Sequence, residues 1–283
     1  MQELDDYINK VKNLPPAPRI LPELLGLLRK ENVDSSRVVQ LISFDPAITA
    51  SVLRLCNSAL FAGASPATDL SEAVQRLGFR QIYTLVAAVS GARALTPAQK
   101  GYGISAGELW KHSVTTAVAS QFIARSQDEP EEGLVFTAAL LHDVGKIILA
   151  DALEHTYARL VEESRAQQSA MIETEKRLLG VQHAEVGGRL LTRWKFPENL
   201  VAAVTCHHEP AAAGAHQKLA SYVYLGNMVA YFMGHGYGHQ AFAMRGQSEA
   251  LEILGLKPEA MAGFMIQTFE QLQLVETLFN VSP

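Results

Sequence analysis

An adjacent histidine and aspartate, His142 and Asp143, occur within the segment Leu-Leu-His-Asp-Val-Gly-Lys. An imidazole and a carboxylate placed side by side can share one divalent metal ion. The Gly145-Lys146 step follows at once, and the ammonium of Lys146 can hold a substrate phosphate or instead cap and solvate a helix end. A complete metal site requires further ligands from elsewhere in the chain.

Further histidines fall within or at the ends of predicted helices, and with the first pair they form the predicted ligand set: His112, His142, Asp143, His183, His207 and His208. Imidazole and carboxylate ligands suit Fe, Mn, Zn or similar ions, and ligands that converge from several helices can build a dimetal site. Glu108 lies one helical turn before His112 and can add a carboxylate. A single histidine is more often structural, so only the whole set predicts a divalent metal cofactor. The other four, His155, His216, His235 and His239, are predicted to be exposed.

The elements that must position these residues are predicted to be helices. Apolar residues recur at helical spacing along the chain rather than alternating, which indicates an all-α fold. We expect a first core helix around residues 20–28, followed by helices at about 37–43, 47–58, 70–77, 79–95, 105–126, 132–141, 146–164, 169–179, 183–195, 197–208, 217–233 and 258–280. Pro210 should end the helix that carries the histidine pair, and residues 234–246 should form an exposed loop.

Composition excludes several classes of protein. The net charge is −5 over 283 residues and no long Lys/Arg run occurs, which argues against nucleic-acid binding. The acidic start lacks the features of a secretory signal, and no apolar stretch approaches about 18 residues, so we expect a soluble, cytoplasmic protein without a membrane partner. Two cysteines without a Cys-x-x-Cys spacing, Cys56 and Cys206, predict buried core thiols.

Four segments in the first 80 residues point to a family. They are Leu14–Pro18 (Leu-Pro-Pro-Ala-Pro), Asp45–Thr49 (Asp-Pro-Ala-Ile-Thr), Leu53–Ala59 (Leu-Arg-Leu-Cys-Asn-Ser-Ala) and Leu70–Gly78 (Leu-Ser-Glu-Ala-Val-Gln-Arg-Leu-Gly). In this order they resemble the HDOD family, and the resemblance continues to about residue 212. It implies an HD-domain-like helical bundle with an HDOD-specific N-terminal helical subdomain. We therefore expect boundaries at 1–97, 98–212 and 213–283, the last being a helical extension that packs on the HD-like core.

The resemblance also implies a ligand order. Catalytic HD domains take ligands from one early histidine, the His-Asp pair, further histidines and a late aspartate. This chain supplies the histidines in that order, but the position of the late aspartate reads Asn227, a poorer ligand for a cation. Related HD-GYP domains carry a Gly-Tyr-Pro element soon after the histidine pair, and residues 209–216 lack it. Cleavage of cyclic di-GMP is accordingly not favoured.

Two hypotheses follow. The family is found in bacterial signalling and is generally regarded as lacking catalysis, so the first is a non-catalytic or vestigially catalytic regulatory module. Such a module would bind a signalling or regulatory protein, or a small phosphate-containing ligand. The alternative is a metal-dependent phosphohydrolase acting on a nucleotide or another phosphate ester, with Lys146 on the phosphate.

Overall fold

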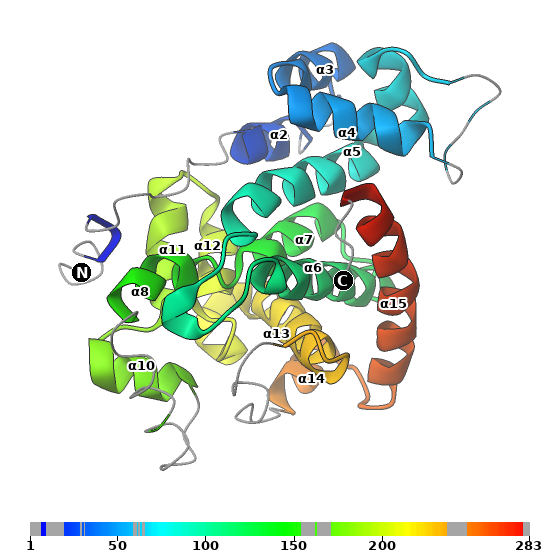
Figure 1. Cartoon of the computed structure of the whole chain (residues 1–283). Helices are drawn as coiled ribbons and strands as arrows, with labels where there is room; N and C mark the ends of the chain where they lie inside the picture. The colour runs from blue at the N-terminus through cyan, green and yellow to red at the C-terminus, as the bar shows by residue number, and fades with distance from the viewer. Residues whose placement is uncertain are drawn as a thin grey trace.

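The computed structural model describes residues 7–9, 20–28, 30, 32–58, 61, 63, 66–153, 162, 171–236 and 248–279. All regular elements among them are helices, which confirms the predicted all-α class (Figure 1). They are α2 (Ile20–Leu28), α3 (Ser35–Ser43), α4 (Pro46–Cys56), α5 (Leu70–Leu95), η1 (Lys100–Tyr102), α6 (Glu108–Ser126), α7 (Glu132–Leu141), α8 (Gly145–Leu153), α10 (Met171–Leu179), α11 (His183–Arg193), α12 (Glu198–Thr205), η2 (Pro210–His216), α13 (Gln217–Phe232), α14 (Glu249–Leu254) and α15 (Ala260–Phe279).

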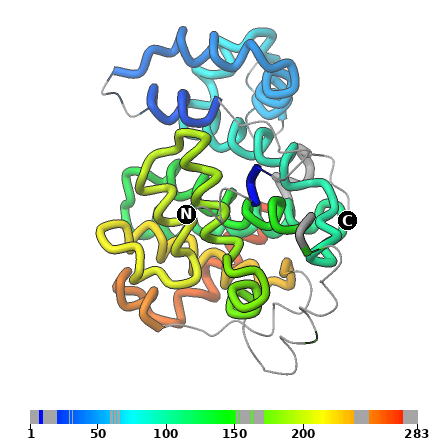
Figure 2. The backbone as a smooth tube through the Cα atoms, turned by 90° about the vertical axis from the view of Figure 1, so that its left-hand side faces the viewer, coloured from blue at the N-terminus to red at the C-terminus, as the bar shows by residue number. Residues whose placement is uncertain are grey.

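Helices α2 to α4 and the start of α5 form a layer at one end of the molecule, and the remaining helices form the larger body (Figures 1 and 2). Aspartates cap helices in this layer. The Asp45 side chain accepts hydrogen bonds from backbone N–H groups in the first turn of α4, where Pro46 has no N–H group that would need an acceptor. Arg93 of α5 donates to both carboxylate oxygens of Asp45, at 2.8 and 2.9 Å. The motif residues therefore have structural roles here.

Two further motif residues, Asn57 and Gly78, also have structural roles. The Asn57 amide donates to the carbonyl of Ala67 and accepts from its backbone N–H, at 2.9 and 2.7 Å, which closes the connection that follows α4. Gly78 has φ +75° and interrupts α5, so the two helices predicted at 70–77 and 79–95 meet at this glycine.

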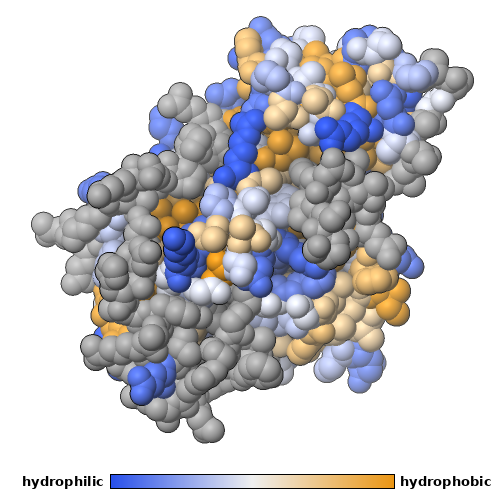
Figure 3. All heavy atoms as spheres, viewed as in Figure 1, coloured by the Kyte–Doolittle hydropathy of each residue, from blue (hydrophilic) through white to orange (hydrophobic). Residues whose placement is uncertain are grey.

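The body is built around α6, which packs against α7 on one side and α13 on the other. Gly226 permits the close crossing of α13 and α6, because a Cβ there would lie 2.0 Å from the Ser120 hydroxyl. That hydroxyl donates to the carbonyl of Tyr222 at 3.0 Å. Helix α15 covers one side of the body (Figure 1), and apolar residues appear at the surface on that side (Figure 3). Ile266 and Phe269 of this helix are exposed.

Some sequence predictions were wrong in detail. The helix predicted at 197–208 ends earlier, at Thr205, so the His207-His208 pair lies beyond it, and Pro210 begins a 3₁₀ helix. Helix α14 was not predicted, and Cys206 is half-buried rather than buried, although both cysteines are free thiols. Residues 14–18, 154–161, 169–170, 237–246 and 280, on which other predictions fall, lie outside the described residues. The domain boundaries at 97 and 212 stay predictions.

One segment in the described part of the chain, Glu132–Ala150, is long and apolar enough by composition to cross a membrane. It runs from α7 into α8, and 89% of its most apolar window is buried inside the molecule. Burial of this kind is typical of a core segment rather than a lipid-facing one.

Candidate metal centre

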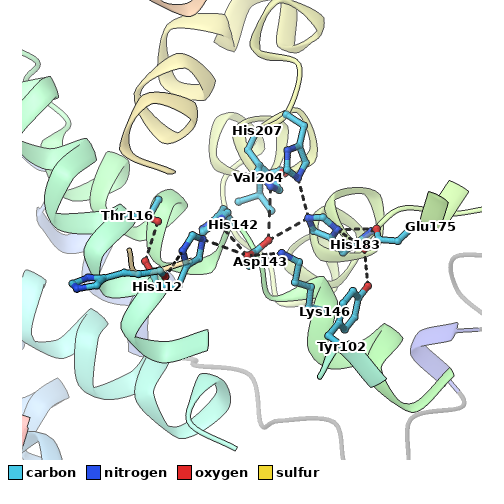
Figure 4. Close-up of polar contacts among 12 residues, drawn as sticks. Tyr102, His112, Thr116, His142, Asp143, Lys146, Glu175, His183, Val204 and His207 are labelled. Carbon is cyan, nitrogen blue, oxygen red and sulfur yellow. Dashed lines mark hydrogen bonds and ion pairs between the residues drawn. The ribbon is translucent and has the colours of Figure 1, made fainter. Parts of the chain in front are cut away.

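The six predicted ligands come together in the body, and Figure 4 labels all of them except His208. His112 lies on α6, His142 and Asp143 lie between α7 and α8, and His183 begins α11. The pair His207-His208 follows α12. Their possible ligand atoms form two groups, within each of which all atoms lie within 4.8 Å of one another: His112, His142 and Asp143 in one, and His183, His207 and His208 in the other.

A glycine brings the two groups together. A Cβ at Gly145 would lie 1.9 Å from the carbonyl oxygen of His183, so only glycine lets the start of α8 approach the start of α11 so closely. This contact sets His183 beside Asp143. Gly145 therefore has a packing role, which the sequence pattern alone did not indicate.

Asp143 stands at the centre of the cluster. Its Oδ2 lies 3.3 Å from Nε2 of His142 and 3.7 Å from Nε2 of His112. Its Oδ1 lies 3.2 Å from Nε2 of His183 and 3.8 Å from Nε2 of His207. Each of these four histidines is at most 1% exposed. One carboxylate thus faces four imidazole nitrogens in the interior.

The other ring nitrogen of each histidine is held by an acceptor. His142 Nδ1 lies 2.6 Å from the carbonyl oxygen of Ala139, and His207 Nδ1 lies 2.7 Å from that of Val204. A carbonyl oxygen only accepts, so Nδ1 carries a proton and Nε2 is the nitrogen that faces the cluster. Fixing the tautomer through the second nitrogen is the usual arrangement of metal-bound histidines.

His112 and His183 follow the same rule with different acceptors. His112 Nδ1 donates to the carbonyl of His235 at 3.1 Å, whereas His183 Nδ1 lies 2.8 Å from Oε2 of Glu175. Burial is the largest influence on the pKa of His183 and lowers it, but the charge of Glu175 and the hydrogen bonds with Asp143 and Glu175 together raise it by more, so the net shift is upward. All four rings therefore turn Nε2 inward, which fits a divalent cation in the cluster.

Electrostatics also suit a cation. Burial, aided by His142, lowers the pKa of His112 to about 3, and burial and neighbouring imidazoles hold the pKa of His207 well below its usual range. These rings are therefore neutral near pH 7. Burial alone would raise the pKa of Asp143, but His142 and Lys146 hold it well below its usual range, so the carboxylate stays charged.

Lys146 points inward. Its ammonium lies 2.7 Å from Oδ2 of Asp143, and both side chains are 2% exposed. The reading of Lys146 as a solvated helix cap was therefore wrong. The ammonium is paired with Asp143. The predicted phosphate-binding role of Lys146 stays a prediction.

Two further predicted residues differ from the six. Glu108 is exposed and its carboxylate accepts the backbone N–H of Ser105 at 2.5 Å, so it organises the start of α6 and is not brought into the cluster. Asn227 is 2% exposed on α13, and its Oδ1 has no hydrogen-bond partner in the described part of the chain. It lies one turn before Tyr231, whose ring centroid is 5.0 Å from that of His112. Its role as a ligand stays a prediction.

The sequence did not indicate the residues around the ligands. His235 was predicted to be exposed but is half-buried, and its ring binds the Thr115 hydroxyl at 2.8 Å while its carbonyl binds His112. His216 is also half-buried, and His155 and His239 lie outside the described residues. Glu175 and Tyr102 were missed. The only available signal was that Glu175 shares the buried face of its helix with Met171 and Thr174.

Comparison with known proteins places this arrangement in a family. The model of the HDOD domain matches residues 14–210. The chain belongs to the HDOD domain family. A curated relative from Treponema pallidum (strain Nichols), itself uncharacterised, is 27% identical over 229 residues, or 80% of this chain. The chain spans only 44% of that relative's length.

Solved HDOD-like structures share the fold. A Geobacter sulfurreducens HDOD domain protein of unknown function has a TM-score of 0.68 at 22% identity, over 94% of this chain and 87% of its own. A Shewanella amazonensis SB2B protein, provisionally described as a phosphohydrolase, has a TM-score of 0.67 at 24% identity, over 94% and 97%. A Marinobacter aquaeolei VT8 protein, provisionally described in signal transduction, has a TM-score of 0.73 at 22% identity, over 99% and 64%. Their coverage extends past residue 210, so the C-terminal helices belong to the shared fold.

Proposed function

We propose that this HDOD protein is a regulatory module of bacterial signalling whose buried histidine cluster binds a divalent metal ion without needing to turn over a substrate. The observation that carries the proposal is the cluster itself. Four imidazoles, each fixed through Nδ1, direct Nε2 towards the single carboxylate of Asp143. Without a cation, the lone pairs of the neutral His112 and His207 rings would face one buried negative charge, which is an unfavourable arrangement in the interior.

The residues that would hold the metal are the six predicted ligands, His112, His142, Asp143, His183, His207 and His208. Their donor set of imidazole nitrogens with one carboxylate suits Fe, Mn, Zn or similar ions rather than Ca or Mg, which prefer oxygen ligands. Such a site can stabilise the fold, because a metal that binds only the native state adds to its stability.

Three features favour regulation over catalysis. The four central histidines are buried, and Lys146 is turned onto Asp143 rather than towards an incoming phosphate. Asn227 replaces the carboxylate that the resemblance implies, which removes charge compensation for a first metal. Partners in keeping with this role are a signalling or regulatory protein, or a small phosphate-containing ligand. The provisional description of the Marinobacter relative, in signal transduction, agrees with a regulatory role.

The test combines metal content with partner capture. Wild-type protein, the double variant His142→Ala/Asp143→Ala and the control His216→Ala would be compared by elemental analysis and by cross-linking in the native cell. We expect metal in wild type and in the control, loss of metal in the double variant, and a regulatory partner recovered with wild type. Robust turnover of phosphate esters together with failure to recover any regulatory partner would refute the proposal.

A second candidate is a metal-dependent phosphohydrolase acting on a nucleotide or another phosphate ester. The presence of two adjacent ligand groups favours it, because phosphoryl transfer commonly uses two ions, and the Shewanella relative carries a matching provisional description. Bound divalent ions would supply Lewis-acid chemistry to the phosphoryl group, and Lys146 would have to leave Asp143 to bind it. Cleavage of a generic phosphodiester or nucleotide by metal-loaded wild type, abolished in His142→Ala/Asp143→Ala, would support this function. Equal rates in both proteins would exclude it.

A further inference from the structure

Glu175 is a buried carboxylate outside the predicted ligand set. It lies on α10, is 0% exposed, and accepts the backbone N–H of His183 at 2.8 Å. Its two oxygens lie 3.0 and 2.8 Å from Nδ1 of the same histidine. The hydroxyl of Tyr102 donates to Oε1 at 2.9 Å (Figure 4). These contacts hold the carboxylate in one orientation behind the His183 ring.

The two ligand groups differ in charge. One contains Asp143, whereas the other consists of three imidazoles, from His183, His207 and His208. An imidazole that donates a ring lone pair to a metal ion is neutral, so these three ligands bring no negative charge. Asp143 is shared between the groups and is already paired with Lys146. A cation among the three histidines therefore has little ligand charge of its own.

We propose that Glu175 is a positioning residue that supplies this missing negative charge, acting through the Nδ1–H of His183 on a divalent transition-metal ion held by the three histidines. This inference rests on the proposed metal-binding function. A carboxylate that accepts the Nδ1 proton fixes the ring and makes Nε2 a stronger donor to a metal. Loss of such a partner ordinarily weakens metal binding by about 10- to 100-fold.

The effect is specific to one ring. His112, His142 and His207 donate Nδ1 to neutral backbone carbonyls, whereas His183 faces a carboxylate. Tyr102 completes the arrangement from η1, and it is only 1% exposed. A Cβ at the preceding Gly101 would lie 1.9 Å from the carbonyl oxygen of Ala150, so η1 is packed directly onto α8. Tyr102 is thereby held at a fixed distance from the cluster.

The test uses full-length Glu175→Gln, which nearly keeps the shape of the side chain and removes its charge. Glu173→Gln is the matched control, because Glu173 is exposed on the same helix. Zn²⁺ affinity would be measured by chelator competition, and Co²⁺ absorption would report the ligand field. We expect Glu175→Gln to weaken one Zn²⁺ binding step by about 10- to 100-fold and to alter the Co²⁺ spectrum, while Glu173→Gln matches wild type.

Nitrogen NMR of the metal-free proteins gives a readout that a merely structural role would not move. We expect a proton on Nδ1 of His183 in wild type and its partial transfer to Nε2 in Glu175→Gln. Equal Zn²⁺ affinity in wild type and Glu175→Gln overturns this inference alone, whereas wild type that binds no Zn²⁺ overturns the proposed function as well. Should Glu175→Gln fail to fold, wild-type NMR decides, because an unprotonated His183 Nδ1 overturns the inference.

Discussion

Replacing Lys146 by methionine tests how the cluster is charged. The ammonium lies 2.7 Å from Oδ2 of Asp143, and both side chains are 2% exposed. Methionine has a similar length and fills the same space without a charge, so the variant isolates the ion pair from packing. We expect metal-free Lys146→Met to be less stable than wild type and to gain more stability from added metal.

The magnitude follows from burial. Removing one partner of a buried ion pair ordinarily costs about 3–5 kcal/mol, because the remaining charge stays in the interior without compensation. In Lys146→Met that charge is Asp143, whose remaining neighbours include the neutral ring of His112. A divalent ion beside Asp143 would restore the compensation, and its binding would raise the free energy of unfolding.

The assay is urea unfolding, with chelator and with excess Mn²⁺ or Zn²⁺. Lys176→Met is the control, because Lys176 is 49% exposed and its pair with Glu185, 2.8 Å long, should contribute only about 0–1 kcal/mol. If the free energies of unfolding of Lys146→Met and wild type in chelator differ by less than about 1 kcal/mol, Lys146 does not compensate the buried charge of Asp143.

Three further predictions concern other residues. Asn57→Ala leaves both backbone groups of Ala67 without their partner and should lower the free energy of unfolding by about 1–3 kcal/mol; a change under about 0.5 kcal/mol in urea unfolding would contradict this. Asn227→Asp should destabilise metal-free protein, and added Zn²⁺ should restore stability in thermal melts; no recovery would place Asn227 outside the site. The pKa of His112, about 3, lies below its unfolded value of about 6.5, so the unfolded chain binds more protons between these pH values. The free energy of unfolding in chelator should therefore decrease as the pH drops below about 6.5. The free energy of unfolding of His112→Asn should decrease less steeply over the same range.

The sequence predicted the helical class and most helix positions because apolar periodicity and caps are local signals. Gly78 and Asp45 illustrate this, since a positive φ and a side-chain cap depend on the residue and its neighbours. Helix α14 was missed because it has only 6 residues, too few to show a period. The end of α12 was misplaced because Pro210 can begin a 3₁₀ turn as readily as it stops a helix.

The ligands were predictable because their types and order carry the chemistry, but their surroundings were not. Glu175 meets His183 across the turn that joins α10 to α11, a contact that no periodic pattern signals, and His235 meets His112 across more than a hundred residues. Glu108 is the opposite case, a residue predicted as a possible ligand that lies outside the cluster. Its spacing from His112 suits a shared helical face, but its carboxylate binds the backbone of Ser105 at the start of the helix instead.

The central claim is that the buried cluster holds a metal. The most direct measurement is anomalous diffraction from crystals of the purified protein, with elemental analysis of the same sample. We expect an anomalous peak within the cluster of the six predicted ligands, from an ion of the Fe, Mn or Zn type. A cluster that shows no anomalous peak, even in crystals soaked with Zn²⁺, would contradict this claim.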